Sequence, residues 1–363
     1  MQVQAVPGLS LSKKQMHAII GDAEKTAAAV KLVYVHDSQP GIARHKAGKG
    51  FSYSLAGNKV TGKDTLQRIR SLAIPPAWQQ VWICASPDGH LQATGIDAKH
   101  RKQYKYHARW NALRNHTKFY RMIEFAKVLP LIRKKVAQDI LLPGLPPEKI
   151  LALIVKLMEK THIRIGGNFY EQVYGSFGLT TLKGRHVSIN GSELRFFFKG
   201  KKGIEHSIRL RSKKLAALVK QCKEIPGKEL FQYFDETGIK KSVDSGMVND
   251  YIKKLSGADF TAKDFRTWAG TIGAFTAFKQ LGIPETSAER KKNIIGVLDT
   301  VAKDLGNTRN VCKKYYVHPA ILTLYESGSL EEYFKPSNGH TEKNNHTQLN
   351  IEEQVIISVL EHM

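Results

Sequence analysis

The sequence changes character near residue 110, and this change limits the possible folds more than any other feature. Before it, short β-forming runs alternate with turn residues, at 30–37, 51–57 and 81–95, and the last of these predicts a hairpin that turns at Pro87-Asp88-Gly89. One helical stretch, 65–73, is stopped by Pro75 and Pro76. After about residue 115, apolar side chains recur at helical spacing. The pattern predicts an α+β fold, with a small β-rich N-terminal domain over 1–110 and a larger, mainly α-helical domain over 115–335.

The second domain contains one β segment among its helices. Residues 178–210 predict three strands, with turns at Lys183–Gly184, at Asn190–Gly191 and between Gly200 and Gly203. Around this segment, the spacing of apolar residues predicts helices over 118–138, 147–162, 212–222, 244–255, 261–281 and 287–304. Pro130 is expected to kink or break the first of them, because proline cannot donate a helical hydrogen bond.

Residues 336–363 form a third segment. It opens with a polar run rich in Asn and His, typical of a linker, and closes with an amphipathic pattern at Ile351, Val355, Ile356, Val359 and Leu360. It holds one Lys and four Glu, so residues 1–335 carry 55 Lys and Arg against 28 Asp and Glu, a net charge of +27. The positive field therefore belongs to the two domains and not to this tail.

The charge indicates the kind of partner. A formal net charge of +24 over 363 residues favours a polyanion, and nucleic acid is preferred over the alternatives of a ribosome-associated protein or an anionic-membrane binder. No run of about 18 apolar residues is present, and the N-terminus lacks the pattern of a signal peptide. We expect a cytoplasmic protein with no membrane partner.

The cysteines do not indicate a disulfide framework or a metal site. Cys84, Cys222 and Cys312 are odd in number and far apart, with no Cys-x-x-Cys pair. Cys312 lies four residues before Tyr316 and is expected to be a small buried filler rather than a nucleophile.

Residues 101–110 interleave cations with aromatic side chains: Arg101, Lys102, Lys105 and Arg109 with Tyr104, Tyr106 and Trp110. In a strand, Gln103 and Lys105 would share one face, and Tyr104 and Tyr106 the other. Such a strand could present phenols and an amide to a DNA groove, where glutamine can read adenine. The alternative is a half-exposed edge strand whose tyrosines pack on the core.

Two adjacent tyrosines, Tyr315 and Tyr316, lie in a lysine-rich stretch that ends at Pro319. A tyrosine with a pKa near 10 costs roughly 4 kcal/mol to ionise at pH 7 unless nearby positive charge helps. Arginines such as Arg164 and Arg266 supply that charge and match the oxygens of a phosphorane. A lysine can also lose its proton, so Lys201 is a candidate general acid for a departing 5′-oxygen.

Each of these signals has a simpler reading. Arg164 could stabilise a helix C-terminus, and the turn at Lys201 could be a solvated hairpin tip. Arg266 could pair with Asp264, and Tyr316 could be a packing aromatic. Only the order and spacing of these residues along the chain are specific.

That order resembles the type IB DNA topoisomerases, in the small bacterial and poxvirus form of the eukaryotic-type topoisomerase I family. The resemblance runs from about residue 30 to 325. It is carried by IPPAW (74–78), VWICASPDGHLQATGIDAKHRKQY (81–104), IRIGGNFY (163–170), FKGKKG (198–203), KDFRTWAG (263–270), and LGN followed by a tyrosine nine residues on (305–316).

The resemblance implies roles for the candidate catalytic residues. Tyr316 would attack a phosphodiester and become linked to the 3′-phosphate, with Arg164 and Arg266 clamping the non-bridging oxygens and Lys201 protonating the 5′-oxygen. Poxvirus-type enzymes have histidine at the position of Asn307, whose amide can donate one hydrogen bond but adds no charge. Asn307 is therefore expected to matter less than either arginine. Tyr315 is the rival for the nucleophile, but the nine-residue spacing from Asn307 favours Tyr316.

The resemblance also implies the DNA contacts and the mode of action. Arg101, Gln103, Tyr104 and Tyr106 would contact DNA from the N-terminal domain, and Tyr170 and Lys263 would contact phosphates from the catalytic domain. The two domains of a monomer would close around duplex DNA of the bacterial nucleoid, and one strand would rotate to relax supercoils of either sign. No ATP, metal or other cofactor is expected, and no phosphate loop or HExxH motif is present.

The main alternative is a tyrosine site-specific recombinase, which uses a similar set of residues to join different duplexes. Such enzymes usually carry His-x-x-Arg at the second arginine, where this chain has Lys263 in KDFR. The β-rich N-terminus also differs from the helical core-binding domain of recombinases. A non-catalytic DNA-binding module is the more distant alternative.

Overall fold

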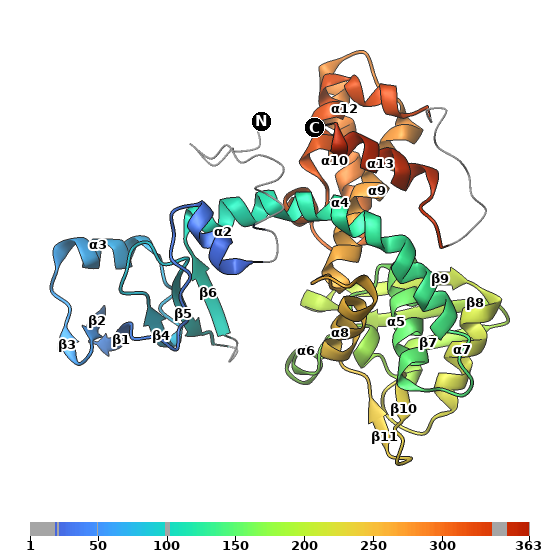
Figure 1. Cartoon of the computed structure of the whole chain (residues 1–363), viewed down its shortest axis with the longest axis horizontal. Helices are drawn as coiled ribbons and strands as arrows, with labels where there is room; N and C mark the ends of the chain where they lie inside the picture. Colours follow the sequence, from blue (N-terminus) through green and yellow to red (C-terminus); the bar gives the residue numbers. More distant parts are fainter. Residues whose placement is uncertain (1–18, 20–21, 49, 99–101, 336–346, 363) are drawn as a thin grey trace. The chain divides into compact units, whose positions relative to one another are not determined.

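A computed structural model of the chain describes residues 19, 22–48, 50–98, 102–335 and 347–362, with only the backbone for 115–120 (Figure 1). The fold is mixed, with an antiparallel β domain first and a larger helical domain after it, which confirms the predicted α+β class. Two compact units divide the chain between Arg121 and Met122. Within the described residues, no helix combines the length and apolar character needed to cross a bilayer.

The first unit is built on a six-stranded antiparallel sheet in the order β3-β2-β1-β4-β5-β6. Its elements are α2 (Ala23–Ala29), β1 (Ile42–Ala47), β2 (Gly50–Leu55), β3 (Asn58–Lys59), α3 (Lys63–Ser71), β4 (Gln79–Ile83), β5 (Leu91–Ile96) and β6 (Lys102–Tyr106). Ile69 of α3 packs with Ile42, Val81, Ile83 and Ala93 of the sheet. The β4–β5 hairpin and helix α3 confirm the sequence predictions, whereas β1 was not predicted because it is rich in polar residues.

One predicted strand is wrong. Residues 30–37 make only an isolated bridge between Val33 and Gly89. The Val33 N–H donates to the Asp88 carbonyl at 2.8 Å, but the next donor, Val35 N–H, bonds the Nδ1 atom of His90 at 3.1 Å. A side chain thus takes the place of the neighbouring backbone, and no ladder forms beyond one bridge.

Helix α4 (Ala108–Asp139) continues past Pro130, so the alternative of a helix break there is wrong. The second unit then contains α5 (Pro147–Thr161), α6 (Asn168–Tyr174), α7 (Lys213–Glu224), α8 (Ser245–Ser256), α9 (Ala262–Leu281), α10 (Ser287–Asp304), α11 (Arg309–Tyr315), α12 (Pro319–Ser327) and α13 (Ile351–Glu361). Short 3-10 helices occur at η1 (Leu179–Thr181), η2 (Gly184–His186), η3 (Lys201–Gly203) and η4 (Ser329–Tyr333).

The three-stranded β insertion is confirmed as β7 (Val187–Asn190), β8 (Glu193–Lys199) and β9 (Glu205–Arg211), although it starts at residue 187 and not at 178. The preceding residues form the 3-10 helices η1 and η2. Strand β8 alternates buried and more exposed side chains, and β9 alternates half-buried and exposed ones, which gives the sheet one face toward the core. A small pair, β10 (Gln232–Phe234) and β11 (Lys240–Ser242), was not predicted.

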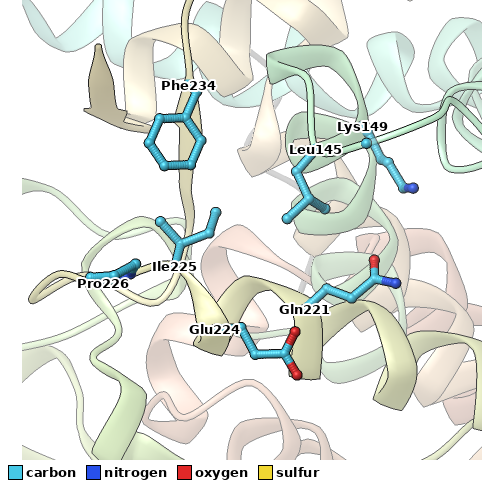
Figure 2. A pocket seen from close by; sticks show the side chains of 8 residues that line it. Leu145, Lys149, Gln221, Glu224, Ile225, Pro226 and Phe234 are labelled. Carbon is cyan, nitrogen blue, oxygen red and sulfur yellow. The ribbon is translucent and has the colours of Figure 1, made fainter. Parts of the chain in front are cut away.

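A cavity of about 410 Å³ opens where the end of α7 meets β10 (Figure 2). Leu145, Ile225 and Phe234 supply apolar side chains to it, while Lys149 and Glu224 supply charge. None of the candidate catalytic or DNA-binding residues lines this cavity. It is therefore separate from the chemistry predicted from the sequence.

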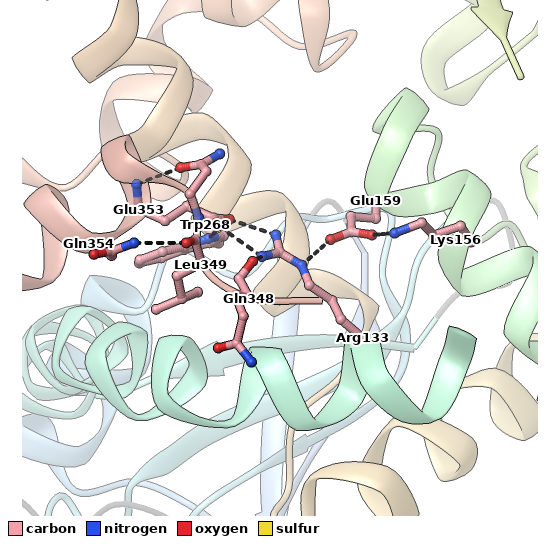
Figure 3. Close-up of polar contacts among 9 residues, drawn as sticks. Arg133, Lys156, Glu159, Trp268, Gln348, Leu349, Glu353 and Gln354 are labelled. Atoms are coloured by element: carbon pink, nitrogen blue, oxygen red, sulfur yellow. Dashed lines mark hydrogen bonds and ion pairs between the residues drawn. The ribbon is translucent and has the colours of Figure 1, made fainter. Parts of the chain in front are cut away.

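The C-terminal helix α13 packs on α9 through a buried polar network (Figure 3). Glu353 accepts hydrogen bonds from Arg133 Nη2 and Nη1 at 2.7 and 2.8 Å, and from Trp268 Nε1 at 2.9 Å. Arg133 Nε also donates to Glu159 at 2.5 Å. Burial alone would lower the pKa of Arg133, but the two carboxylates raise it above its usual value. The predicted amphipathic tail helix is thus part of the catalytic unit, whereas the predicted linker at 336–346 lies outside the described residues.

Candidate active site

Arg266 lies in the second turn of α9, a helix whose start is defined by a capping box. Asp264 accepts hydrogen bonds from the Thr261 N–H at 2.8 Å and from its hydroxyl at 3.1 Å. The cap sets the first turn, and residue 266 then faces inward, with 5% of its surface exposed. The predicted alternative role of Asp264, a salt bridge to Arg266, gives way to this capping role in the structure.

Two backbone carbonyls hold the Arg266 guanidinium. Nη1 donates to the carbonyl of His162, at the end of α5, and Nη2 donates to the carbonyl of Leu305 at 2.6 Å. The third nitrogen, Nε, is buried and has no hydrogen-bond partner among the described residues. The guanidinium is therefore fixed in orientation but not saturated.

Arg164 follows α5, and its side chain reaches the loop at 305–307, which also provides the Leu305 carbonyl to Arg266. Its Nη2 donates to the Gly306 carbonyl at 3.0 Å and to Asn307 Oδ1 at 2.7 Å. The Arg164 backbone is itself pinned, because its carbonyl accepts from the Leu179 N–H at 2.8 Å. One short loop after α10 thus supplies successive acceptors to both arginines.

Asn307 uses its side-chain amide within the protein. Its Oδ1 atom accepts from Arg164, and its Nδ2 atom donates to the Leu305 carbonyl at 3.3 Å. The backbone N–H of Asn307 also donates to the Ala302 carbonyl at 2.8 Å. In this arrangement Asn307 orients Arg164.

Tyr316 directly follows helix α11, and its ring lies against Arg266. The guanidinium carbon of Arg266 is 5.3 Å from the centre of the ring, within the range of a cation–π contact. The Tyr316 carbonyl accepts from the Thr271 hydroxyl of α9 at 3.2 Å, which ties the residue to the helix that carries Arg266. Tyr315 instead has its ring 5.3 Å from the ammonium of Lys314. The two tyrosines therefore have different surroundings, and only Tyr316 contacts Arg266 through a cation–π contact among the described residues.

The cluster of Arg164, Arg266, Asn307 and Tyr316 is positively charged. Among the described residues, no carboxylate forms an ion pair with either arginine. Burial, and then the charge of Arg266, lowers the pKa of Arg164 to about 10, and burial also lowers the pKa of Arg266. At neutral pH Arg164 still carries its proton. A site with desolvated cations and no counter-ion of its own is suited to bind an anion.

Cys312 has the structural role predicted for it. It is fully buried beside the cluster, and burial raises the pKa of its thiol to about 11. Cys84, Cys222 and Cys312 are all free, and the described residues contain no group of three His, Cys, Asp or Glu side chains that could hold a metal ion.

Lys201 and Tyr170 meet at a second place. Lys201 is exposed on the turn between β8 and β9, as predicted, and its ammonium lies 5.8 Å from the centre of the Tyr170 ring. Tyr170 lies on the short helix α6, where it is 41% exposed. Lys263 is exposed in the first turn of α9, one turn before Arg266.

The predicted strand of the N-terminal unit is β6, at the edge of its sheet. Tyr104 and Tyr106 share a face, are 48% and 38% exposed, and stack with their ring centres 6.0 Å apart. The ring of Tyr106 also lies 6.0 Å from that of the buried His90, so the alternative of a half-exposed edge strand that packs on the core holds in part. The amide of Gln103 donates to Asp97 at 3.0 Å. Arg101 lies outside the described residues.

Sequence reasoning did not single out His206 or Gly306. The His206 ring lies close to Gly306, whose carbonyl accepts from Arg164. Period-two alternation in β9 places His206 on the half-buried face with Ile208 and Leu210, and that spacing was the one available signal.

Comparisons with known proteins show the family of this chain. Residues 105–335 match the family model described as the catalytic core of eukaryotic DNA topoisomerase I, and residues 50–97 match the N-terminal domain of bacterial DNA topoisomerase IB. A DNA topoisomerase 1B of Acanthamoeba polyphaga mimivirus is 33% identical over 296 residues, which covers 79% of this chain and 88% of the relative.

These matches define an enzyme class, the DNA topoisomerases, which are isomerases with DNA as their substrate. More narrowly, this chain belongs to the type IB DNA topoisomerase family, in its small form.

Proposed function

We propose that this enzyme relaxes positive and negative supercoils by transient cleavage of one DNA strand, through a 3′-phosphotyrosyl intermediate, and that it needs neither ATP nor a metal ion. The observation that carries the proposal is the cluster of Arg164, Arg266 and Tyr316. Two arginines that have no carboxylate partner in the described part of the chain lie beside one phenol, and a phosphodiester would supply negative charge there.

In the cleavage step, the Tyr316 oxygen attacks phosphorus and the bond from phosphorus to the 5′-oxygen breaks. The phenol proton leaves to solvent, and the cation over the ring stabilises the negative charge that develops on the phenolic oxygen. Arg164 and Arg266 would donate to the non-bridging oxygens, and the unpartnered Nε of Arg266 is one available donor. Each well-placed donor of this kind contributes a factor of roughly 10² to 10³ in rate.

Lys201 would donate a proton to the departing 5′-oxygen. Its place on an exposed turn suits a residue that must reach a bound duplex, and its ammonium lies 5.8 Å from the centre of the Tyr170 ring. Religation is the reverse reaction, in which the 5′-hydroxyl attacks the phosphotyrosyl bond and Lys201 recovers its proton.

Asn307 would act mainly by orienting Arg164, to which it is already bonded at 2.7 Å. A rotation of the amide would let its nitrogen reach a phosphate oxygen, but it cannot add a charge. We therefore keep Asn307 in the catalytic set with a smaller contribution than that of either arginine.

The N-terminal domain, residues 1–110, would act as a DNA clamp for the catalytic domain, residues 115–335, within a monomer. Exposed Tyr104 and Tyr106 on an edge strand support a DNA-contacting role for β6, and the net charge of +24 supports binding along the phosphate backbone. Tyr170 and Lys263 would contact phosphates near the cleavage site. The natural substrate would be duplex DNA of the bacterial nucleoid.

Relaxation without cofactors tests this proposal. Negatively and positively supercoiled plasmids are incubated with the protein in EDTA without ATP, and the products are separated on agarose gels. Both plasmids should give ladders of relaxed topoisomers, because the phosphotyrosyl bond conserves the energy of the broken ester. A strict metal requirement, or no relaxation of either plasmid, would overturn the proposal.

A further inference from the structure

His206 lies on the core-facing side of the three-stranded sheet, between two loops of the catalytic unit. It pairs across the strands with Phe198, and the two rings stack with centres 5.0 Å apart and planes 14° from parallel. Strand pairing and stacking together fix the direction of the imidazole. Its ring is half-buried.

The other sides of the imidazole face two glycines. A Cβ atom on Gly200 would lie 2.6 Å from both Cδ2 and Nε2 of His206, and a Cβ atom on Gly306 would overlap Cε1. Neither glycine can therefore carry a side chain while the ring is in place. Gly306 also has a φ of +56°, a conformation that favours glycine in any case.

Each glycine adjoins a candidate catalytic residue. Gly200 precedes Lys201 and closes its turn, since its N–H donates to the Ile204 carbonyl at 2.7 Å. Gly306 precedes Asn307, and its carbonyl accepts from Arg164 at 3.0 Å. The imidazole thus lies between the turn that carries Lys201 and the loop that accepts hydrogen bonds from Arg164.

We propose that His206 is a positioning residue for strand cleavage: packed between Gly200 and Gly306, its ring sets the position of Lys201 relative to the phosphate-binding loop. The inference rests on the proposed function and goes beyond it, because His206 need not touch the DNA. Without the ring, the turn of Lys201 loses the surface against which it packs, and the proton donor moves away from the 5′-oxygen.

The charges around the ring suit a neutral spacer. Burial, followed by the nearby charges of Arg164 and Arg266, lowers the pKa of His206. The ring therefore adds no third cation that would repel the arginines or Lys201 at neutral pH. Its role requires shape and not proton exchange.

A DNA substrate in which sulfur replaces one bridging oxygen tests the proposed role of His206. The cleavage position is first mapped on an ordinary duplex, and a second duplex then carries sulfur in place of the 5′-bridging oxygen at that position. A thiolate leaves without receiving a proton, so loss of the general acid slows cleavage only of the oxygen-linked duplex. The single-turnover rate of covalent adduct formation is measured on both duplexes, with Lys201→Ala as the reference for a lost proton donor.

His206→Ala should slow cleavage of the oxygen-linked duplex by roughly 10- to 100-fold, which is the usual effect of displacing a catalytic group by about 1 Å. On the sulfur-linked duplex its rate should stay within about threefold of the original protein, as for Lys201→Ala. His206→Gln, with a similar volume and no titratable group, should recover most of the lost rate. The thermal midpoint and duplex affinity of each variant show whether it is folded and binds DNA.

The contact between the His206 ring and Gly200 can be tested by a second, independent measurement. Gly200→Ala alone should slow oxygen-linked cleavage, because the new methyl group displaces the ring. In a His206→Ala background the same change should cost nothing further, since the space is empty. Non-additivity of this kind is the signature of direct contact.

The outcomes separate this inference from the function on which it rests. If the unaltered protein formed no covalent adduct, the proposed function would fail, and the role of His206 with it. If that adduct formed but His206→Ala was equally fast, or equally slow on both duplexes, only the role of His206 would be overturned. Failure of His206→Gln to recover the rate, or additive losses with Gly200→Ala, would also contradict a positioning role.

Discussion

The guanidinium carbon of Arg266 lies 5.3 Å from the centre of the Tyr316 ring, although the two residues are on different helical segments. This contact places a desolvated cation beside a phenol that follows the last turn of a helix. It distinguishes Tyr316 from Tyr315, whose ring faces the exposed Lys314.

Tyr316→Phe should bind duplex DNA with unchanged affinity and form no covalent adduct, because phenylalanine keeps the ring under Arg266 and removes only the attacking oxygen. Denaturing gels of protein incubated with labelled duplex measure the adduct. Tyr315→Phe is the matched control and should retain most of the cleavage activity. The opposite pattern, with the adduct lost only in Tyr315→Phe, would mean that the neighbouring tyrosine is the nucleophile.

Inorganic phosphate should raise the thermal stability of the protein, because it supplies an anion to Arg164 and Arg266, which pair with no carboxylate among the residues that the structure describes. At a phosphate concentration ten times the dissociation constant, binding to the folded state adds about 1.4 kcal/mol. Arg164→Gln should lose most of this gain, measured against chloride at equal ionic strength. Arg211→Gln, which removes an arginine that is 82% exposed, is the matched control and should keep it.

The same measurement has a predicted pH dependence. The pKa of Arg164 is about 10, below its ordinary value, so the side chain loses its proton as the pH rises through that value. Stabilisation by phosphate should therefore persist from neutral pH to about pH 9 and weaken above pH 10. A phosphate effect that was the same in Arg164→Gln and in the unaltered protein would show that the anion binds elsewhere.

Asn307→Ala should slow adduct formation by about tenfold, less than the roughly 10²- to 10³-fold expected for loss of an arginine donor. The reason is that alanine removes the Oδ1 acceptor at 2.7 Å from Arg164 but leaves the Gly306 carbonyl in place. Arg164→Ala is the comparison variant in the same single-turnover assay. An Asn307→Ala defect as large as that of Arg164→Ala would assign Asn307 a direct contact with the phosphate.

Much of the architecture follows from local sequence patterns, but the failures have a common cause. The β4–β5 hairpin is indicated by Pro87 and Gly89 between two β-forming runs, and its strands pair with each other. In contrast, β1 pairs with β2 and β4 although its own sequence is rich in polar residues, so its assignment depends on partners far along the chain. The strand predicted at 30–37 does not form because the His90 side chain accepts the hydrogen bond from the Val35 N–H.

The arrangement of the candidate site likewise depends on contacts between residues far apart in the sequence. The motif order singled out Arg164, Arg266 and Tyr316, but their convergence depends on the carbonyls of Leu305 and Gly306, which any residue type provides. Backbone acceptors leave no signature in a sequence. His206 was hidden for a related reason, since a lone histidine on the apolar side of a strand resembles an ordinary core residue.

Glu353→Ala should destabilise the protein by about 3 to 5 kcal/mol, because it removes one of the two carboxylates that hold the buried Arg133. Glu352→Ala is the matched control on the same helix. Its partner Lys279 is 3.3 Å away and partly exposed, so its loss should cost less than about 1 kcal/mol. Urea unfolding followed by circular dichroism measures both, and equal losses would contradict a structural role for the buried network.

Tyr104→Ala should weaken duplex binding with little change in stability, since the side chain is 48% exposed on an edge strand and can stack on or contact the DNA. Phe234→Ala on β10 is the control, because it removes an aromatic ring of equal exposure, 49%, from a segment without a predicted DNA role. Binding is measured by titration at several salt concentrations. Equal weakening by both substitutions would indicate a general effect of surface aromatic residues.

The pairing of Arg133 with Glu353 also affects the order in which the chain can fold while it is synthesised on the ribosome. The two residues are 220 positions apart in the sequence, and translation proceeds at about 5 to 20 residues per second. Glu353 is therefore synthesised roughly 10 to 45 s after Arg133. During that interval α9, which carries both Trp268 and Arg266, lacks the helix that packs on it in the finished protein. Tyr316, the proposed nucleophile, is therefore synthesised before α13, the helix that completes this packing.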